Sequence, residues 1–150
     1  VEMKVLIAYD TKHGNTKKVG ELIAEGINTS EGNKIIVENV KDIDLDKDET
    51  YDLILIGSPN HMGAHISSVK KFIKNLSKAR LKVNAYAVFD TYMTKDFEKA
   101  VKKMENQINK TMPDLMRASP GLSIKVGGMK GPIVEEDLPK CKDFGIGLIK

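Results

Sequence analysis

The sequence predicts an α/β protein in which helices cover both faces of a parallel sheet. Apolar runs of strand length alternate with amphipathic helical patterns almost to the last residue. The middle runs, such as residues 53–56, are apolar at every position, which is typical of parallel strands buried on both faces. No repeat, low-complexity tract or change in composition divides the 150 residues, so we expect a single domain spanning residues 1–150.

The first part of the chain contains two predicted strands, residues 3–9 and 35–40. Between them, apolar side chains recur at i, i+3, i+4 and i+8, which predicts an amphipathic helix through Val19, Leu22, Ile23 and Ile27. The following segment, 41–50, is dense in Asp and Lys and has no clear period. We therefore predict a solvated connection there, and the crossover helix between the second and third strands is the element that the sequence predicts least clearly.

Three further strands are predicted over residues 51–57, 83–89 and 122–126. A helix between the first two of these carries Val69, Phe72, Ile73 and Leu76 on one face. The next helix carries Phe97, Val101, Met104 and Ile108, with Thr94 as its predicted N-cap. Segment 111–121 contains two prolines and a glycine and is predicted to be a loop. The last helix carries Leu138, Cys141, Gly145 and Leu148.

The composition excludes several classes of protein. The single cysteine, Cys141, can form neither an intramolecular disulfide nor a thiolate metal cluster, so we expect no metal site of that kind. No apolar stretch approaches the roughly 20 residues of a membrane span, and no leader pattern opens the chain. The net charge of +3 comes mainly from lysine, with two arginines and no tryptophan, which disfavours nucleic-acid binding. We expect a cytoplasmic protein without membrane or nucleic-acid partners.

A dense set of hydrogen-bond donors lies between the first predicted strand and the first predicted helix. Thr11, Asn15 and Thr16 carry side-chain donors, and Gly14 permits a tight turn of the backbone. Because a strand that leads directly into a helix points successive N–H groups at one spot, this loop favours an anion. We predict a phosphate-binding loop formed by Thr11, Lys12, His13, Gly14, Asn15 and Thr16.

Other phosphate-binding families fit this loop less well. The alternative with no ligand is an ordinary turn in which Asn15 or Thr16 only caps the helix. Gly14 is not followed by the Lys-Ser/Thr of a Walker loop, and no G-x-G-x-x-G sequence follows the strand. A receiver domain would need an acidic phosphoacceptor at the end of the third strand, where this chain has Gly57 and Ser58.

The loop resembles that of the flavodoxin family, whose pattern is Ser/Thr, any residue, Thr, Gly, any residue, Thr. The chain matches it from Thr11 to Thr16, except that His13 replaces the usual threonine. Gly57-Ser58-Pro59 followed by Gly63, and Lys130-Gly131-Pro132, are also similar to the family. The resemblance implies a flavodoxin-like three-layer sandwich with a five-stranded parallel sheet in the order 2-1-3-4-5, and FMN as the cofactor. No insertion interrupts the fifth strand, as in short-chain members.

The resemblance also implies which residues surround the flavin ring. His61 or Met62 would cover its inner face and Tyr92 its outer face. A peptide next to Gly63, either Met62–Gly63 or Gly63–Ala64, would flip when the ring is reduced. Besides the phosphate loop, the implied site consists of Ser58, Pro59, Asn60, His61, Met62, Gly63, Asp90, Thr91 and Tyr92.

The implied function is one-electron transfer between unidentified partners, a donor reductase and an acceptor, with FMN shuttling between semiquinone and hydroquinone and without a catalytic residue. Positive residues beside the loops, Lys12, His13, His61 and Lys95, predict a less negative potential than in acidic relatives. One charge about 10 Å away corresponds to roughly 20–70 mV. The alternatives are an FMN-dependent oxidoreductase acting on a quinone- or porphyrinogen-like substrate, and a non-redox phosphate-binding module.

Overall fold

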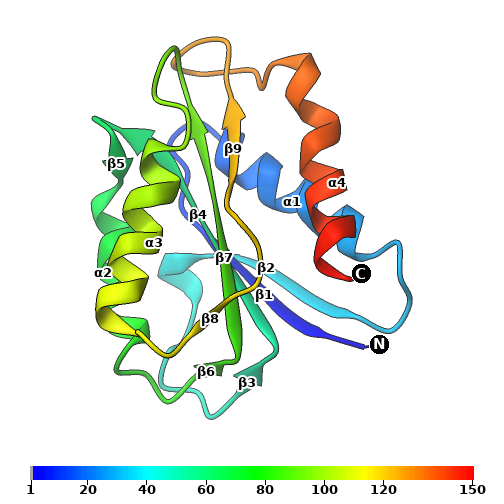
Figure 1. Cartoon of the computed structure of the whole chain (residues 1–150), viewed down its shortest axis with the longest axis vertical. Coiled ribbons are helices and arrows are strands. Elements are labelled where there is room, and N and C mark those ends of the chain that lie inside the picture. The colour runs from blue at the N-terminus through cyan, green and yellow to red at the C-terminus, as the bar shows by residue number, and fades with distance from the viewer. Residues whose placement is uncertain (1) are drawn as a thin grey trace.

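A computed structural model describes residues 2–150 as a parallel sheet flanked by two layers of helices (Figure 1). The sheet order is β2 (Lys34–Asn39), β1 (Lys4–Tyr9), β4 (Leu53–His61), β7 (Ala85–Tyr92), with a fifth position beside β7. Two short strands share that fifth position: β8 (Met116–Arg117) pairs with the start of β7 and β9 (Leu122–Lys125) with its end. The predicted order 2-1-3-4-5 is confirmed.

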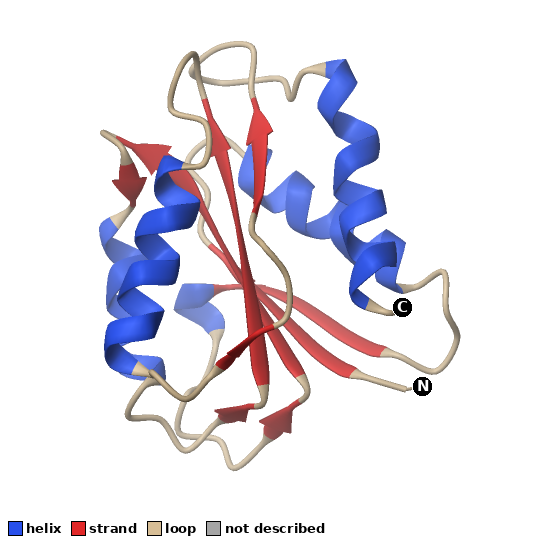
Figure 2. Cartoon of the chain, in the orientation of Figure 1, coloured by secondary structure: helices blue, strands red, loops and turns tan. Residues whose placement is uncertain are grey.

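Four α-helices within residues 2–150 cover the sheet, two on each face (Figure 2). One face packs against α1 (Asn15–Ile27) and α4 (Leu138–Leu148), the other against α2 (Ser67–Leu76) and α3 (Lys99–Thr111). Side chains alternate along each central strand, so Leu6 and Ile54 enter the core under α2 and α3 while Val5 and Leu55 enter the other. Within residues 2–150, no helix combines the length and apolarity that crossing a bilayer requires.

Helices α1 and α4 cross with their backbones in close approach. A Cβ atom built on Gly26 would lie 2.1 Å from the carbonyl oxygen of Lys142, and one on Gly145 would lie 2.2 Å from that of Ile23. Only glycine therefore fits at the crossing point. This close packing explains how α4, whose buried residues are few, is still held firmly against the molecule.

Both central strands extend further than the sequence predicts. β4 runs to His61 rather than residue 57, and β7 runs to Tyr92 rather than residue 89. Parallel pairing of Ser58 with Asp90 and of Pro59 with Thr91 extends the ladder between them. A short hairpin strand, β5 (Ala64–His65), then pairs back onto the end of β4. The residues that follow the predicted ends of both strands, 58–61 and 90–92, are thus held by the sheet.

The segment between β2 and β4 contains no α-helix, in keeping with its missing period. It forms a 3₁₀ turn, η1 (Val40–Asp42), and then β3 (Thr50–Tyr51), which pairs in parallel with β6 (Lys82–Val83). A second 3₁₀ turn, η2 (Glu135–Asp137), leads into α4. Segment 111–121 is not wholly a loop, because α3 ends at Thr111 and β8 lies inside it.

The prediction that Thr94 caps the third helix is wrong. Thr94 has a left-handed backbone conformation, with φ of 54°, and α3 begins only at Lys99. The carboxylate of Asp90, at the end of β7, instead accepts a hydrogen bond from the Val101 N–H at 2.9 Å. A buried strand residue therefore satisfies a donor of the first helical turn, which a local capping pattern does not reveal.

Candidate functional site

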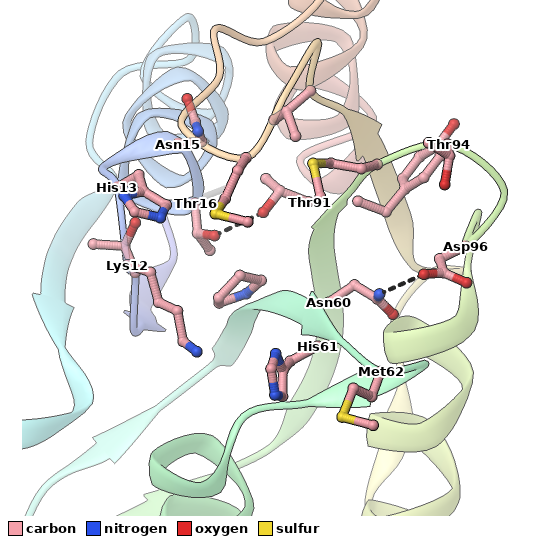
Figure 3. A pocket seen from close by; sticks show the side chains of 16 residues that line it. Lys12, His13, Asn15, Thr16, Asn60, His61, Met62, Thr91, Thr94 and Asp96 are labelled. Atoms are coloured by element: carbon pink, nitrogen blue, oxygen red, sulfur yellow. Dashed lines mark hydrogen bonds between the residues drawn. The ribbon is translucent and has the colours of Figure 1, made fainter.

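A cavity of about 400 Å³ opens where the carboxyl ends of β1, β4 and β7 meet (Figure 3). This edge is where open α/β sheets bind their ligands, and the volume falls within the range of roughly 300–1,000 Å³ for small-molecule sites. Four segments line the cavity: the loop from β1 into α1, the β4–β5 hairpin, the segment after β7, and the segment after β9. Its lining is Thr11, Lys12, His13, Asn15, Thr16, Pro59, Asn60, His61, Met62, Thr91, Tyr92, Met93, Thr94, Asp96, Val126 and Met129.

Most of the predicted site residues come together in this lining. They are Thr11, Lys12, His13, Asn15, Thr16, Pro59, Asn60, His61, Met62, Thr91 and Tyr92. The other four predicted residues lie close by in the chain without lining the cavity: Gly14, Ser58, Gly63 and Asp90. Whether any of these residues binds a cofactor stays a prediction.

The first loop presents hydrogen-bond donors to the cavity. Gly14 has φ of 92° and is the N-cap of α1, and its N–H donates to the Thr11 hydroxyl oxygen at 2.9 Å. That contact leaves the Thr11 O–H itself able to donate. The first intrahelical hydrogen bond runs from the Lys18 N–H to the Gly14 carbonyl at 3.0 Å. The earlier N–H groups of the helix therefore have no carbonyl of the helix to bind, and they suit an anion.

Asp10, the residue before this loop, holds it in place through hydrogen bonds. Asp10 is 5% exposed, and its carboxylate accepts hydrogen bonds from the Thr11 N–H at 2.7 Å, from the Asn39 side chain at 3.1 Å and from the Ser68 hydroxyl. Burial raises the pKa of Asp10, but the hydrogen bonds from Ser68, Asn39 and Thr11, together with Lys41, outweigh it and leave the pKa below its usual value. An ionised Asp10 thus ties the loop to β2 and to the start of α2.

A buried hydroxyl pair connects the start of α1 to β7. The Thr16 and Thr91 side-chain oxygens lie 3.0 Å apart, and Thr16 is 1% exposed. Each hydroxyl has one proton to donate. If the Thr91 hydroxyl donates to the Thr16 oxygen, the Thr16 proton is free to bind a ligand in the cavity. The direction of this hydrogen bond therefore decides whether Thr16 can donate to the ligand.

The β4–β5 hairpin turns through two residues with positive φ, Met62 at 52° and Gly63 at 80°. Positive φ at both central residues is the requirement of a type I′ turn, in which glycine is at ease and methionine is strained. The turn leaves the Met62 side chain 90% exposed at the mouth of the cavity.

Asn60, just before this turn, has one satisfied and one unsatisfied side-chain atom. Its Nδ2 donates to Asp96 Oδ2 at 3.0 Å, an interaction drawn in Figure 3. Its Oδ1 is buried and accepts no hydrogen bond from any group of residues 2–150. A buried carbonyl oxygen without a donor is costly, and a ligand that carries an N–H or O–H group would satisfy it.

Ser58 and Asp90 lie behind the cavity wall and have structural partners. The Ser58 hydroxyl oxygen accepts the Ile66 N–H at 3.0 Å, which fixes the approach to α2. Asp90 is fully buried and accepts the Ser123 hydroxyl at 2.6 Å. Burial raises the pKa of Asp90 to about 6, although the Ser123 and Val101 hydrogen bonds oppose this shift.

Sequence reasoning missed five residues of the lining: Met93, Thr94, Asp96, Val126 and Met129. The first three follow directly from the extension of β7, which carries the wall past residue 92. The others come from the segment after β9, where a Cβ atom built on Gly131 would lie 2.5 Å from Asn15 Oδ1. The noted Lys130-Gly131-Pro132 sequence was a signal for this contact, because a glycine beside a phosphate loop allows close approach.

The site suits a phosphorylated flavin better than a metal or a thiol chemistry. Neutral donors at one end of the cavity can bind a phosphate, the orphaned Asn60 oxygen can accept a ring N–H, and apolar walls can enclose a ring. Residues 2–150 contain no group of three metal-ligating side chains. Cys141 is buried, and burial raises the pKa of its thiol to about 12.

Comparison with known proteins agrees with this geometry. The family model of the flavodoxin domain matches residues 6–129. A flavodoxin of Aquifex aeolicus (strain VF5) is 37% identical over 73 residues, which is 49% of this chain and only 40% of that protein. An uncharacterized protein of Methanocaldococcus jannaschii is 27% identical over 155 residues, covering 99% of both chains. A solved flavodoxin from the domain Archaea shares the fold, with a TM-score of 0.79 and 24% identity over 97% of this chain and 96% of that chain.

Flavodoxins bind a flavin, typically FMN, and transfer electrons to redox partners. The matched region, residues 6–129, contains the phosphate loop, the β4–β5 hairpin and the segments after β7 and β9 that line the cavity. This chain belongs to the flavodoxin family.

Proposed function

We propose that this chain binds FMN in the cavity and carries single electrons between redox proteins, the coenzyme cycling between its semiquinone and hydroquinone forms. The observation that carries the proposal is the loop from Thr11 to Thr16, whose neutral donors open into a cavity of about 400 Å³. A dianionic phosphate needs several such donors, and no arginine is required when helix N–H groups and hydroxyls converge.

Each part of the lining has a distinct task in this proposal. The Thr11 and Thr16 hydroxyls and the first N–H groups of α1 bind the phosphate. Asn60 Oδ1 accepts a hydrogen bond from the edge of the ring system. Tyr92 and Val126 provide apolar walls that exclude water from the ring. FMN itself supplies the redox chemistry, and the protein positions it and adjusts its potential.

The test is titration of the purified protein with FMN, with the quenching of flavin fluorescence as the signal. Photoreduction of the complex is the second step. Thr11→Val keeps the side-chain shape but removes the hydroxyl that we assign to the phosphate, and with it the acceptor of the Gly14 N–H. We expect FMN affinity to fall about tenfold to a hundredfold, as for the loss of a hydrogen bond to a charged group. Thr50→Val, an exposed position on β3, is the matched control and should leave affinity unchanged. A wild-type protein that fails to quench FMN would refute the proposal.

Steady-state turnover separates the carrier from the oxidoreductase alternative. A carrier exchanges electrons rapidly with a reductase but turns over quinones with NAD(P)H no faster than free FMN does. Turnover well above that of free FMN would identify an enzyme instead. Rapid exchange without such turnover is the result expected here.

A further inference from the structure

We propose that the mouth of the cavity is a docking surface for an acidic one-electron-transfer protein. The inference rests on the proposed function, because it names the partner of the same site. Two features carry it: a ring of exposed apolar side chains around the mouth, and an adjoining positively charged surface. The two adjoin each other, since Met62 and Lys12 line both the cavity and a second hollow beside it.

The apolar rim consists of Met62, Met93, Phe97 and Met129. Their exposed fractions are 90%, 37%, 56% and 72%, respectively. Of the large apolar side chains exposed in residues 2–150, only Ile36 and Met116 lie outside this rim. Three of the four line the cavity, and Phe97 packs edge-on against Tyr92 of the lining, with ring centroids 5.6 Å apart.

This gathering of apolar side chains is a signature of a protein interface. Single exposed apolar residues need no explanation, but a cluster surrounded by charge does. Methionine is flexible and polarizable and adapts to different partner surfaces. Met62 is 90% exposed although it borders the cavity, so the rim presents apolar surface to solvent that a protein partner can cover.

The positively charged surface lies next to the rim, on the side of Met62 and Lys12. A second hollow, of about 490 Å³, lies beside the cavity and is lined by residues that include Lys12, His61 and Lys70 but no carboxylate. Within residues 2–150, no Asp or Glu oxygen forms an ion pair with Lys12 or Lys70. Lys95 adds a further exposed charge between two lining residues, Thr94 and Asp96.

Two acidic residues beside the rim are paired with lysines. Asp96 forms an ion pair with Lys99 at 3.2 Å, and Glu98 lies 3.9 Å from Lys102. Lys12, Lys70 and Lys95, by contrast, have no ion-pair partner among residues 2–150, so this side of the rim is positively charged. Complementarity then selects a partner whose redox centre is bordered by carboxylates, because potentials of opposite sign steer the encounter and like charges reject it.

The experiment measures binding of the FMN-loaded protein to two defined probes by calorimetry, at ionic strengths from about 20 mM to about 300 mM. A plant-type [2Fe–2S] ferredoxin is the acidic probe and mitochondrial cytochrome c the basic one. Lys70→Glu with Lys95→Glu reverses two charges beside the rim. Lys34→Glu with Lys78→Glu reverses two exposed charges away from the rim, at the start of β2 and in the turn after α2, and changes the net charge equally.

We expect the ferredoxin to bind more tightly than cytochrome c and to lose affinity as salt increases. The reversal beside the rim should weaken it about tenfold, and the control pair about twofold or less. Met62→Gln should weaken binding about threefold at every ionic strength, whereas Met116→Gln, exposed on β8 at the far edge, should not.

Tighter binding of cytochrome c, or ferredoxin binding that ignores the charge reversal, would overturn the inference while leaving FMN binding intact. The inference would also be overturned if the FMN-loaded wild type bound neither probe and Met62→Gln raised the KM for menadione. That result would assign the rim to a small molecule. Protein that does not bind FMN at all fails the earlier titration, and it would overturn the proposed function together with this inference.

Discussion

The buried carboxyl of Asp90 makes a prediction about stability and pH that can be worked through from the structure. It lies at the end of β7 with no exposed surface, and burial raises its pKa from 3.8 to about 6. In the unfolded chain the same group titrates near its ordinary value. The folded protein therefore binds this proton more tightly, so this contribution to stability is present in acid and is lost as pH rises towards 6.

The size of the effect follows from the shift. A difference of about two pKa units corresponds to about 3 kcal/mol over the whole titration. Between about pH 4.5 and about pH 7.5, where the fold can be studied conveniently, about 2 kcal/mol of it is visible. His65 acts in the opposite direction, because burial lowers its pKa and its contribution grows as pH rises through its ordinary value of 6.5. A comparison with a variant is needed to separate the two groups.

Asp90→Asn provides that comparison. An amide can present its oxygen to the Val101 N–H and its NH₂ to the Ser123 hydroxyl oxygen, so the contacts survive while the titration disappears. Urea unfolding followed by circular dichroism gives the free energy of unfolding of both proteins at each pH. We expect the wild type to lose about 2 kcal/mol relative to the variant from about pH 4.5 to about pH 7.5. A constant difference, or a gain by the wild type, would refute the argument.

Three further changes test the packing, the turn and the electrostatics. Gly145→Ala should lower the free energy of unfolding by about 2–4 kcal/mol, because the new Cβ would meet the Ile23 carbonyl. Gly147→Ala, in the same helix but with open space around it, should raise the free energy of unfolding by about 0.5–1 kcal/mol. Urea unfolding measures both. Met62→Asn should increase the free energy of unfolding by about 0.5–1 kcal/mol and so raise the melting temperature slightly, because Asn-Gly suits the type I′ turn. An unchanged melting temperature would contradict the claim that Met62 is strained. Lys12→Gln should make the FMN midpoint potential more negative by about 20–70 mV in a redox titration, and a rise would contradict the electrostatic account.

The order of elements could be predicted from the sequence because periodicity reports burial directly. The run 53–56 is apolar at each position, and in the structure Leu53, Ile54, Leu55 and Ile56 are all at most 1% exposed. The fifth strand was harder, since two short pieces share its place and the chain between them contains Pro120 and Gly121. Local composition reads such a break as a loop, although Ala118 still donates its N–H to the Tyr86 carbonyl at 2.8 Å.

The phosphate loop could be predicted because its donors are adjacent in the chain. The remaining lining depends on contacts between distant segments, which one sequence does not display. Asp96 joins the cavity through its bond to Asn60, and Met129 joins it because the chain around Gly131 rests on Asn15. Neither contact leaves a short-range pattern, whereas the Thr11 to Thr16 cluster does.

The exposure of Phe97 in the rim depends on where α3 begins. Asp90, which lies outside that helix, binds an N–H group of its first turn. Periodicity placed Phe97 on the buried face of a helix that started at Thr94. The Asp90 carboxylate instead accepts the Val101 N–H, α3 begins at Lys99, and Phe97 stays in the preceding segment. There it is 56% exposed and packs against Tyr92, beside the cavity. One buried carboxyl thus contributes both to the pH dependence of stability and to the surface offered to a partner. Asp90→Asn should therefore preserve ferredoxin binding only if α3 still begins at the same residue.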